Sequence, residues 1–252
     1  MTKIKTLFLA ANPKGTTQLA LDNEIREITQ KIRLAENRDI LDVISAWAVR
    51  PDDLLQYLNQ HTPQIVHFSG HGSAEGEIIL VDNNGSSKPV SSSALKALFT
   101  TLKDNIKIVV LNACYSQIQG KAINETIDYV LGMNAAIGDE AAITFAASFY
   151  RALGFNRTIQ EAFDQAITAL LLEGIPEDQT PELLIKEGVS AGIRILDFNS
   201  SKEPSSSEAD GNSSNPHAEG NNNLNIKNNS GTAINEVNGN LTINNDNRPI
   251  EK

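Results

Sequence analysis

The segment Ile106-Lys107-Ile108-Val109-Val110-Leu111-Asn112-Ala113 decides the fold class of this chain. It is a short apolar run rich in β-branched residues, which is typical of a strand buried on both faces. Strands of this kind belong to parallel sheets whose two faces are covered by helices. The segment therefore predicts an α/β domain with a mostly parallel sheet.

The sequence around this strand alternates between strand and helix patterns. The apolar run Gln64–Ser69 predicts a second buried strand, and Ser93–Lys103 between the two predicts a crossover helix. Further strands are expected over 4–10, 40–49, 77–81 and 129–136, and further helices over 19–35, 51–59, 115–126, 140–152 and 159–172. This order predicts a mostly parallel sheet with helices on both sides.

Composition and charge exclude several classes of function. The 252 residues are 40% hydrophobic, enough for one globular domain plus additional chain. The formal net charge of -10 would be repelled by phosphate backbones and anionic lipids, so no nucleic acid or membrane partner is expected. The apolar stretches are far shorter than the ~20 residues that span a bilayer, which favours a cytoplasmic protein.

The composition changes sharply after Phe198. Residues 199–220 are almost devoid of apolar side chains and predict a flexible linker. Residues 221–252 are rich in asparagine, but Asn223-Leu224-Asn225-Ile226 recurs as Asn240-Leu241-Thr242-Ile243, 17 residues later. We therefore expect a domain over 1–198, a linker over 199–220 and a patterned tail over 221–252.

Two residues with catalytic chemistry follow the two buried strands. One strand continues into Gly70-His71-Gly72 and the other into Asn112-Ala113-Cys114, at the end of the sheet where ligands bind. A right-handed crossover would place these strands side by side, about 4.8 Å apart. An imidazole within reach of a thiol takes its proton or stabilises the thiolate, which is the chemistry of acyl transfer. The N–H groups of Gly72 and Cys114 would form the oxyanion hole.

Cys114 is the only cysteine of the chain, so an internal disulfide and a cysteine-clustered zinc site are both excluded. A buried structural residue, a thiol without a role and a nucleophile are the three interpretations that stay open for it. No metal ligands are expected elsewhere. His67 and His71 are four residues apart, but four residues of a strand span about 13 Å, too far to share one ion. His67 is instead expected to be a buried, hydrogen-bonded core residue.

The segments His67–Gly72 and Val109–Ser116 resemble the two catalytic motifs of the CHAT family, bacterial caspase-like cysteine peptidases related to separase and the caspases. The resemblance extends over roughly Lys3–Leu184. It implies a caspase-like three-layer α-β-α sandwich, a His71–Cys114 dyad, hydrolysis of peptide bonds in a protein substrate, and no cofactor. Asn112-Ala113-Cys114-Tyr115-Ser116 replaces the Gln-Ala-Cys-x-Gly signature of caspases, so caspase specificity for aspartate does not carry over.

Asp139 and Asn112 are the candidate residues of the substrate pocket. Asp139 and the adjacent Glu140 would favour a basic substrate side chain. Acidic residues also stabilise the start of a helix through its dipole, and this second interpretation of both carboxylates stays open.

Apolar residues alternate with Asn or Thr in the tail, which suits strands stacked in register. The stretch Asn229–Asn244, with Ile234, Val237, Leu241 and Ile243, resembles the amyloid signalling motifs at the ends of bacterial immune effectors. That resemblance implies self-assembly and a receptor with a matching motif, such as a nucleotide-binding NLR-like protein. The alternative is a solvated tail without a role.

These features predict a cysteine endopeptidase effector of a bacterial regulated cell death or antiphage pathway, activated when its amyloid-like tail brings catalytic domains together. One alternative is a catalytically inactive caspase-like adaptor that signals by assembly only, although intact His71, Gly72 and Cys114 argue against it. A different hydrolase or transferase that uses the same cysteine is another alternative.

Overall fold

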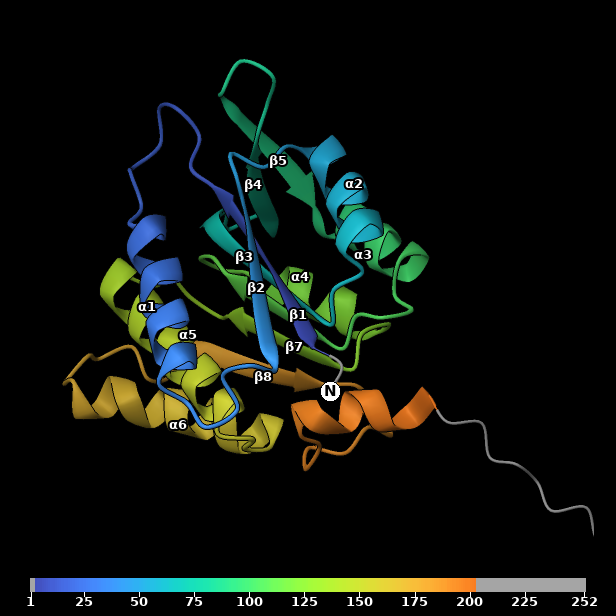
Figure 1. The fold of residues 1–252 in the computed structure, drawn as a ribbon. Helices are drawn as coiled ribbons and strands as arrows, with labels where there is room; N and C mark the ends of the chain where they lie inside the picture. Colours follow the sequence, from blue (N-terminus) through green and yellow to red (C-terminus); the bar gives the residue numbers. More distant parts are fainter. Residues whose placement is uncertain (1–2, 203–252) are drawn as a thin grey trace, which may run out of the picture. The chain divides into compact units, whose positions relative to one another are not determined.

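The structure is a computed structural model, and it describes residues 3–202 (Figure 1). Its main sheet has the strand order β2-β1-β3-β6-β7-β8. All neighbours pair in parallel except β8, which is antiparallel to β7. The strands are β1 (Ile4–Ala11), β2 (Leu41–Trp47), β3 (Ile65–Gly72), β6 (Ile108–Asn112), β7 (Tyr129–Met133) and β8 (Pro181–Ile185).

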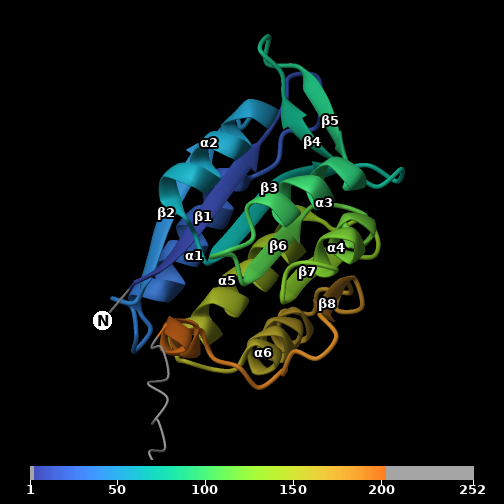
Figure 2. The ribbon, with the colours of Figure 1, turned by 90° about the vertical axis from the view of Figure 1, so that its right-hand side faces the viewer.

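Helices cover both faces of this sheet (Figures 1 and 2). One apolar core joins the sheet to α1 (Leu21–Arg33), α5 (Asp139–Gly154) and α6 (Ile159–Leu172). A second core joins the opposite face to α2 (Pro51–His61), α3 (Ser92–Thr101) and α4 (Gln117–Asn124). Strand residues alternate between the two cores, since Phe8 packs in the first and Leu7 and Leu9 pack in the second. The predicted α-β-α sandwich with a mostly parallel sheet is confirmed.

The sequence predicts part of the β4–β5 hairpin but not the edge strand β8. The hairpin of β4 (Glu77–Val81) and β5 (Ser87–Ser91) fits the expected strand over 77–81. Strand β8 was not predicted, because it begins with Pro181 and Glu182 and has a half-buried apolar run of only three residues. Such a short edge strand lacks the long apolar run that identified the central strands.

Strand β3 changes its partners at the carboxyl end of the sheet. It pairs with β1 as far as Gly70 and with β6 as far as Ser69, which lies opposite Asn112. Beyond this point His71 and Gly72 pair with Ile79 and Ile78 of β4. Strands β3 and β6 therefore separate just where His71 and Cys114 follow.

The end of the described chain is a 3₁₀ helix, η1 (Ile195–Lys202), which continues past Phe198, where the linker was expected to begin. The remainder of the predicted linker and the predicted amyloid motif lie outside the described residues. Within residues 3–202, no helix has the length and hydrophobicity needed to cross a bilayer.

Candidate active site

Cys114 lies in a turn directly after β6. Tyr115, the next residue, has a φ of 55°, a left-handed conformation that is uncommon for a side chain of this size. Ser116 stabilises the turn, because its buried hydroxyl donates to Leu111 O at 2.8 Å and accepts from Met133 N at 2.9 Å. The backbone around the cysteine is thus anchored to both β6 and β7.

The sulfur of Cys114 contacts the loop after β7. The Ile137 N–H donates to Cys114 Sγ across 3.5 Å, and Sγ lies 3.8 Å from Ile137 O. The Tyr115 N–H donates to Ala135 O at 3.0 Å, which fixes the same loop to the turn. The sequence does not predict these contacts, because backbone groups of Ala135 and Ile137 make them. Any residue except proline at position 137 would provide the same N–H.

The ring of His71 is oriented by the loop between β1 and α1. Its Nε2 lies 2.9 Å from the backbone oxygen of Thr17. A carbonyl oxygen can only accept, so Nε2 carries the hydrogen and Nδ1 is the basic nitrogen of the neutral ring. Asn12 stabilises this loop, because its Nδ2 donates to Leu19 O at 3.0 Å.

His71 and Cys114 line one pocket at the carboxyl end of the sheet. Ser69 and Asn112 lie opposite each other in β3 and β6, and His71 and Cys114 follow them by two residues each. The two side chains therefore lie at the same end of neighbouring strands. The pocket is partly open, and its volume is about 40 Å³. Asn112 and Asp139, the two residues predicted for the substrate pocket, line it as well.

Gly72 contacts the cysteine through its backbone. A Cβ built on Gly72 would lie 2.0 Å from the carbonyl oxygen of Cys114, so no side chain fits there. Among residues 3–202, no acceptor takes the N–H of Cys114, which leaves that donor available. The missing side chain of Gly72 thus keeps β3 and the Cys114 turn in contact.

The family model of the CHAT domain matches residues 3–182. The chain belongs to the CHAT domain family. A Roc-COR-CHAT protease from an unknown prokaryotic organism is 30% identical over 181 residues, which are 69% of this chain and 17% of that protein. A probable protease from Gillisia limnaea is 27% identical over 168 residues, 65% of this chain and 30% of that protein. This chain therefore spans less than a third of either relative.

Solved structures show which fold this CHAT domain has. A secreted C11 cysteine protease from Bacteroides thetaiotaomicron, in complex with an irreversible peptide inhibitor, matches with a TM-score of 0.51 at 9% identity, over 73% of this chain and 66% of that one. The Arg-specific cysteine proteinase gingipain R matches with a TM-score of 0.53 at 12% identity, over 73% of this chain and 46% of that one. The likeness confirms a caspase-like fold.

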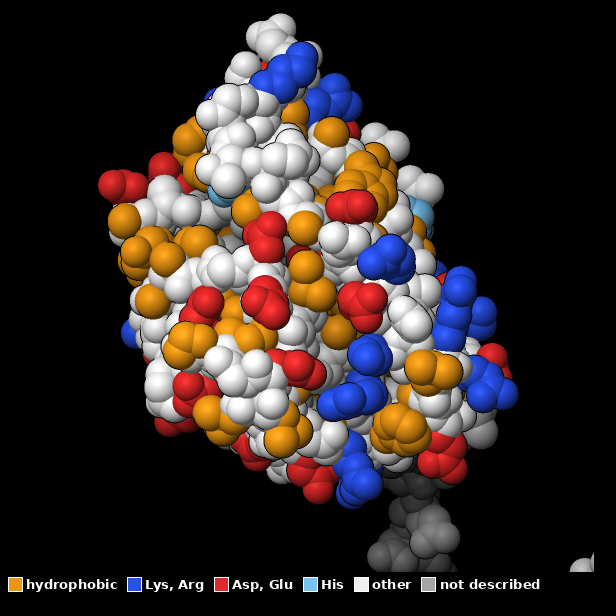
Figure 3. Space-filling model, turned by 90° about the vertical axis from the view of Figure 1, so that its left-hand side faces the viewer, with side chains coloured by type: hydrophobic (Ala, Val, Ile, Leu, Met, Phe, Trp, Pro, Cys, Tyr) orange, Lys and Arg blue, Asp and Glu red, His pale blue; other side chains and the backbone are white. Residues whose placement is uncertain are grey.

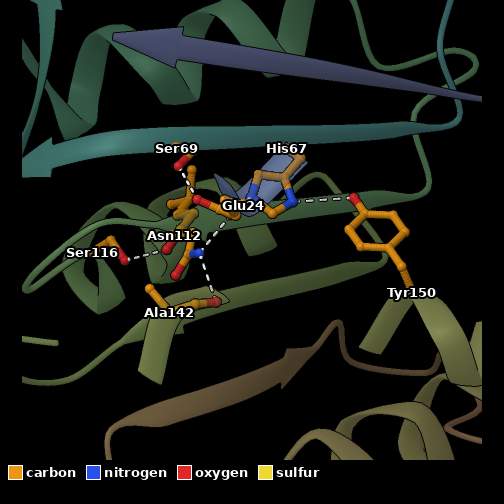
Figure 4. A network of polar contacts seen from close by, with 8 residues as sticks. Glu24, His67, Ser69, Asn112, Ser116, Ala142 and Tyr150 are labelled. Carbon is orange, nitrogen blue, oxygen red and sulfur yellow. Dashed lines mark hydrogen bonds and ion pairs between the residues drawn. The ribbon is translucent and has the colours of Figure 1, made fainter. Parts of the chain in front are cut away.

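A buried polar network lies beneath the pocket of the CHAT domain (Figure 4). At its centre is the carboxylate of Glu24 on α1, which is 2% exposed. Glu24 Oε1 accepts from Asn112 Nδ2 at 2.7 Å, and Oε2 accepts from the hydroxyl of Ser69. His67 Nε2 lies 2.9 Å from Oε1, close enough for an ion pair although not aligned as a hydrogen bond. One carboxylate thus joins β3 and β6.

His67 has the buried role expected for it. It is fully buried, and its Nδ1 lies 3.2 Å from the hydroxyl of Tyr150 on α5. Burial, together with the nearby charge of Glu24, raises the pKa of Tyr150 well above its ordinary value. No group of three or more His, Cys, Asp or Glu residues in the described chain comes together as a metal site.

Glu24 itself was not predicted as a site residue. A signal for it exists in the sequence, because it lies three residues after Leu21 and four before Ile28, on the apolar stripe of α1. A carboxylate on a buried helix face needs polar partners within the fold. Asp139 has an unexpected role too: it begins α5, but its Oδ2 accepts from the N–H of Ala20 at the start of α1, 3.0 Å away.

Proposed function

We propose that this CHAT domain is a cysteine endopeptidase with Cys114 as nucleophile and His71 as general base. The observation that carries the proposal is the common pocket of the two side chains, in which Thr17 O engages His71 Nε2–H and leaves Nδ1 as the basic nitrogen. The curated relatives that are named as proteases support the same activity. A histidine and a cysteine in the sequence would support the proposal less than their common pocket and the oriented ring of His71 do.

In the proposed reaction His71 Nδ1 takes the thiol proton of Cys114, and the sulfur attacks the carbonyl carbon of a peptide bond. The N–H groups of Cys114 and Gly72 donate to the oxygen that becomes negative. The C–N bond then breaks, and the amine leaves with the proton from His71. Water, deprotonated by His71, hydrolyses the thioester and restores the thiol.

The tail provides the proposed route of activation. The repeated apolar pairs of the tail, Leu224/Ile226 and Leu241/Ile243, support stacking of identical chains. Ile234 and Val237 belong with Leu241 and Ile243 to the stretch that resembles an amyloid signalling motif. Stacking, seeded by a receptor with a matching motif, would raise the local concentration of catalytic domains by orders of magnitude. The protein would then be a cytoplasmic effector of a bacterial cell death or antiphage response.

The test uses the full chain and a peptide library read by mass spectrometry. Cleavage by the wild-type chain, its loss in Cys114→Ala, and covalent labelling of Cys114 by an irreversible thiol-directed inhibitor are expected. Equal cleavage by both chains would contradict the proposal. An absence of cleavage and labelling, in a chain that still assembles, would favour the inactive adaptor.

A further inference from the structure

A second pocket lies next to the candidate active site, at the carboxyl ends of β1 and β2. It is partly open, its volume is about 330 Å³, and Leu19 and Leu21 line both this pocket and that of Cys114. Most of its lining residues are apolar: Ala10, Leu19, Leu21, Trp47 and Ala48. A pocket of this size and lining suits one large apolar side chain. We call it the Trp47 pocket.

Trp47 leaves a large apolar surface in contact with water. It is the only tryptophan of the chain, and it is 49% exposed although it belongs to a strand of the main sheet. Its ring centroid lies 6.3 Å from that of Phe8, a core residue, so the core supports the indole. Tryptophan is enriched where proteins bind partners, because its large, rigid ring gains much from burial at little cost in entropy. The exposed part of the ring is therefore a candidate contact for a ligand.

The backbone on both sides of Trp47 is fixed. Trp47 pairs with Ala10 of β1, and the Val49 N–H donates to Ala10 O at 3.1 Å. Ala48, between Trp47 and Val49, has a φ of 53°, a left-handed conformation that is uncommon for a residue other than glycine. Such a conformation persists only where the surrounding structure holds it, and residues of this kind gather at binding sites. The exposure of Trp47 thus results from an ordered turn.

The direction of a bound substrate follows from the positions of His71 and Cys114. In the proposed reaction His71 gives its proton to the leaving amine, so the residues after the cleaved bond lie on the His71 side of the cysteine. The strand order β2-β1-β3-β6 places β3, then β1, then β2 on that side. The substrate chain after the cleaved bond therefore runs toward Trp47.

The distance across the sheet indicates which residue of the substrate reaches the pocket. The strand order puts β3 and β1 between β6 and β2, so the span is about 14 Å at the usual strand spacing. An extended peptide covers this distance with about four residues. The side chain that enters the Trp47 pocket should thus come about four residues after the cleaved bond.

The charges around the Trp47 pocket disfavour an acidic side chain. Among the residues that line it in the described chain, Asp22 alone is charged. Acidic side chains also occur across the middle of the face that carries α1 and α5 (Figure 3). Asp22 is exposed to water, where an ion pair contributes little, so burial against the indole should outweigh the attraction of a basic side chain. An apolar side chain is therefore the expected occupant.

We infer that the Trp47 pocket binds a large apolar side chain of the substrate, about four residues after the cleaved bond. The inference rests on the proposed peptidase function and adds a determinant of specificity on the leaving side of the substrate. Thr17, whose carbonyl orients His71, is in the same loop as Gln18 and Leu19 of the pocket wall. The occupant would thus also contact the loop that orients His71.

The experiment measures kcat/KM of the full chain on variants of one peptide that it cleaves. The sequence before the cleaved bond stays constant, and Phe, Leu, Ala, Lys or Glu is placed in turn at each position after the bond. At about the fourth position, Phe and Leu should exceed Ala by roughly tenfold, because a large apolar side chain is buried there. Trp47→Ala should abolish this preference, whereas Trp47→Phe should keep most of it, since an aromatic ring remains.

The matched control is Leu34→Ala, which removes an exposed apolar side chain just past the other end of α1. Its Phe-to-Ala ratio should equal that of the wild type. A ratio between two substrates does not depend on the fraction of active enzyme, so partial misfolding cannot imitate the result.

Tryptophan fluorescence gives a second measurement, because Trp47 is the only tryptophan of the chain. The full chain with Cys114→Ala should bind the peptides without cleaving them. Its fluorescence should change when the Phe peptide binds and change much less with the Ala peptide. Unchanged fluorescence at saturating Phe peptide would contradict a contact with Trp47 and overturn the inference.

The cleavage assay separates this inference from the proposed function. Cysteine-dependent cleavage without an apolar preference after the bond, or with a preference that Trp47→Ala keeps, would refute the Trp47 pocket and leave the peptidase function in place. An equal loss on Phe and Ala peptides in Trp47→Ala would make Trp47 a structural residue instead. A complete absence of cysteine-dependent cleavage, on the panel and on a general peptide library, would refute both proposals together.

Discussion

Gly72 touches the backbone of Cys114 so closely that a Cβ on Gly72 would lie 2.0 Å from the Cys114 carbonyl oxygen. Gly72→Ala must therefore move either β3 or the turn that carries Cys114. We expect the variant to lose about 10²-fold or more in kcat/KM and about 1–3 kcal/mol in unfolding free energy. Peptide cleavage and urea unfolding measure the two effects.

The loss in Gly72→Ala would come from displacement of the turn, so it does not test the oxyanion hole by itself. Gly192→Ala is the control, since a Cβ there meets only Ser190 Oγ at 3.6 Å, an ordinary contact. Unchanged cleavage and stability in Gly72→Ala would show that the close contact between Gly72 and Cys114 is wrong.

Cys114→Ala and His71→Ala should each abolish cleavage, because nucleophile and base act as one unit whose single losses are not additive. Neither change should lower the unfolding temperature by more than a few degrees, since both side chains are at the carboxyl end of the sheet and only half buried. Cleavage assays and thermal unfolding on the same preparations are the measurements. Residual cleavage above that of the double variant would remove the residue concerned from the dyad.

The sequence predicts the arrangement of strands better than the contacts of the site. Long apolar runs identify β3 and β6, and their parallel pairing follows from the crossover helix between them. The register that places Ser69 opposite Asn112 is known only from the structure. The carbonyl of Thr17 and the N–H of Ile137 could not be predicted, because every residue has a carbonyl and nearly every residue an N–H. Only the fold decides which peptide group meets His71 or Cys114. Glu24 was accessible in principle, as a charged residue on an apolar helical stripe.

The polar network under the pocket should contribute to the stability of the fold. Glu24→Ala leaves Ser69 without its acceptor and a cavity beside His67, and should cost roughly 2–4 kcal/mol of unfolding free energy. Tyr150→Phe removes one hydroxyl at 3.2 Å from His67 and should cost about 1 kcal/mol. Urea unfolding measures both losses of unfolding free energy. A larger loss in Tyr150→Phe than in Glu24→Ala would contradict the prediction.

Alkaline pH should destabilise the fold through Tyr129. Burial, with Asp128 and Asp197 nearby, raises its pKa to about 12, and its hydroxyl donates to Ser190 O at 2.6 Å. A raised pKa means that the fold prefers the neutral phenol, so this contribution is complete below pH 10 and is lost between pH 10 and about 12. Tyr129→Phe should be less stable at pH 7 and decline less steeply in that range, as followed by urea unfolding. Parallel decline of both proteins would refute this role.

The tail prediction depends on the repeat of Asn223-Leu224-Asn225-Ile226 as Asn240-Leu241-Thr242-Ile243. If the two segments are strands of one stacking unit, a peptide of residues 221–247 should form fibres with the cross-β spacing of about 4.7 Å in X-ray diffraction. Proline at position 243 removes a backbone donor from every stacked copy, so Ile243→Pro should prevent fibre growth, whereas Ile243→Val should not. In the full chain, Ile243→Pro should abolish activation by seeds of the wild-type peptide and leave covalent labelling of Cys114 at high protein concentration intact. Fibre formation by the Ile243→Pro peptide, or seeded activation of that chain, would refute recruitment through the tail while leaving the peptidase assignment untouched.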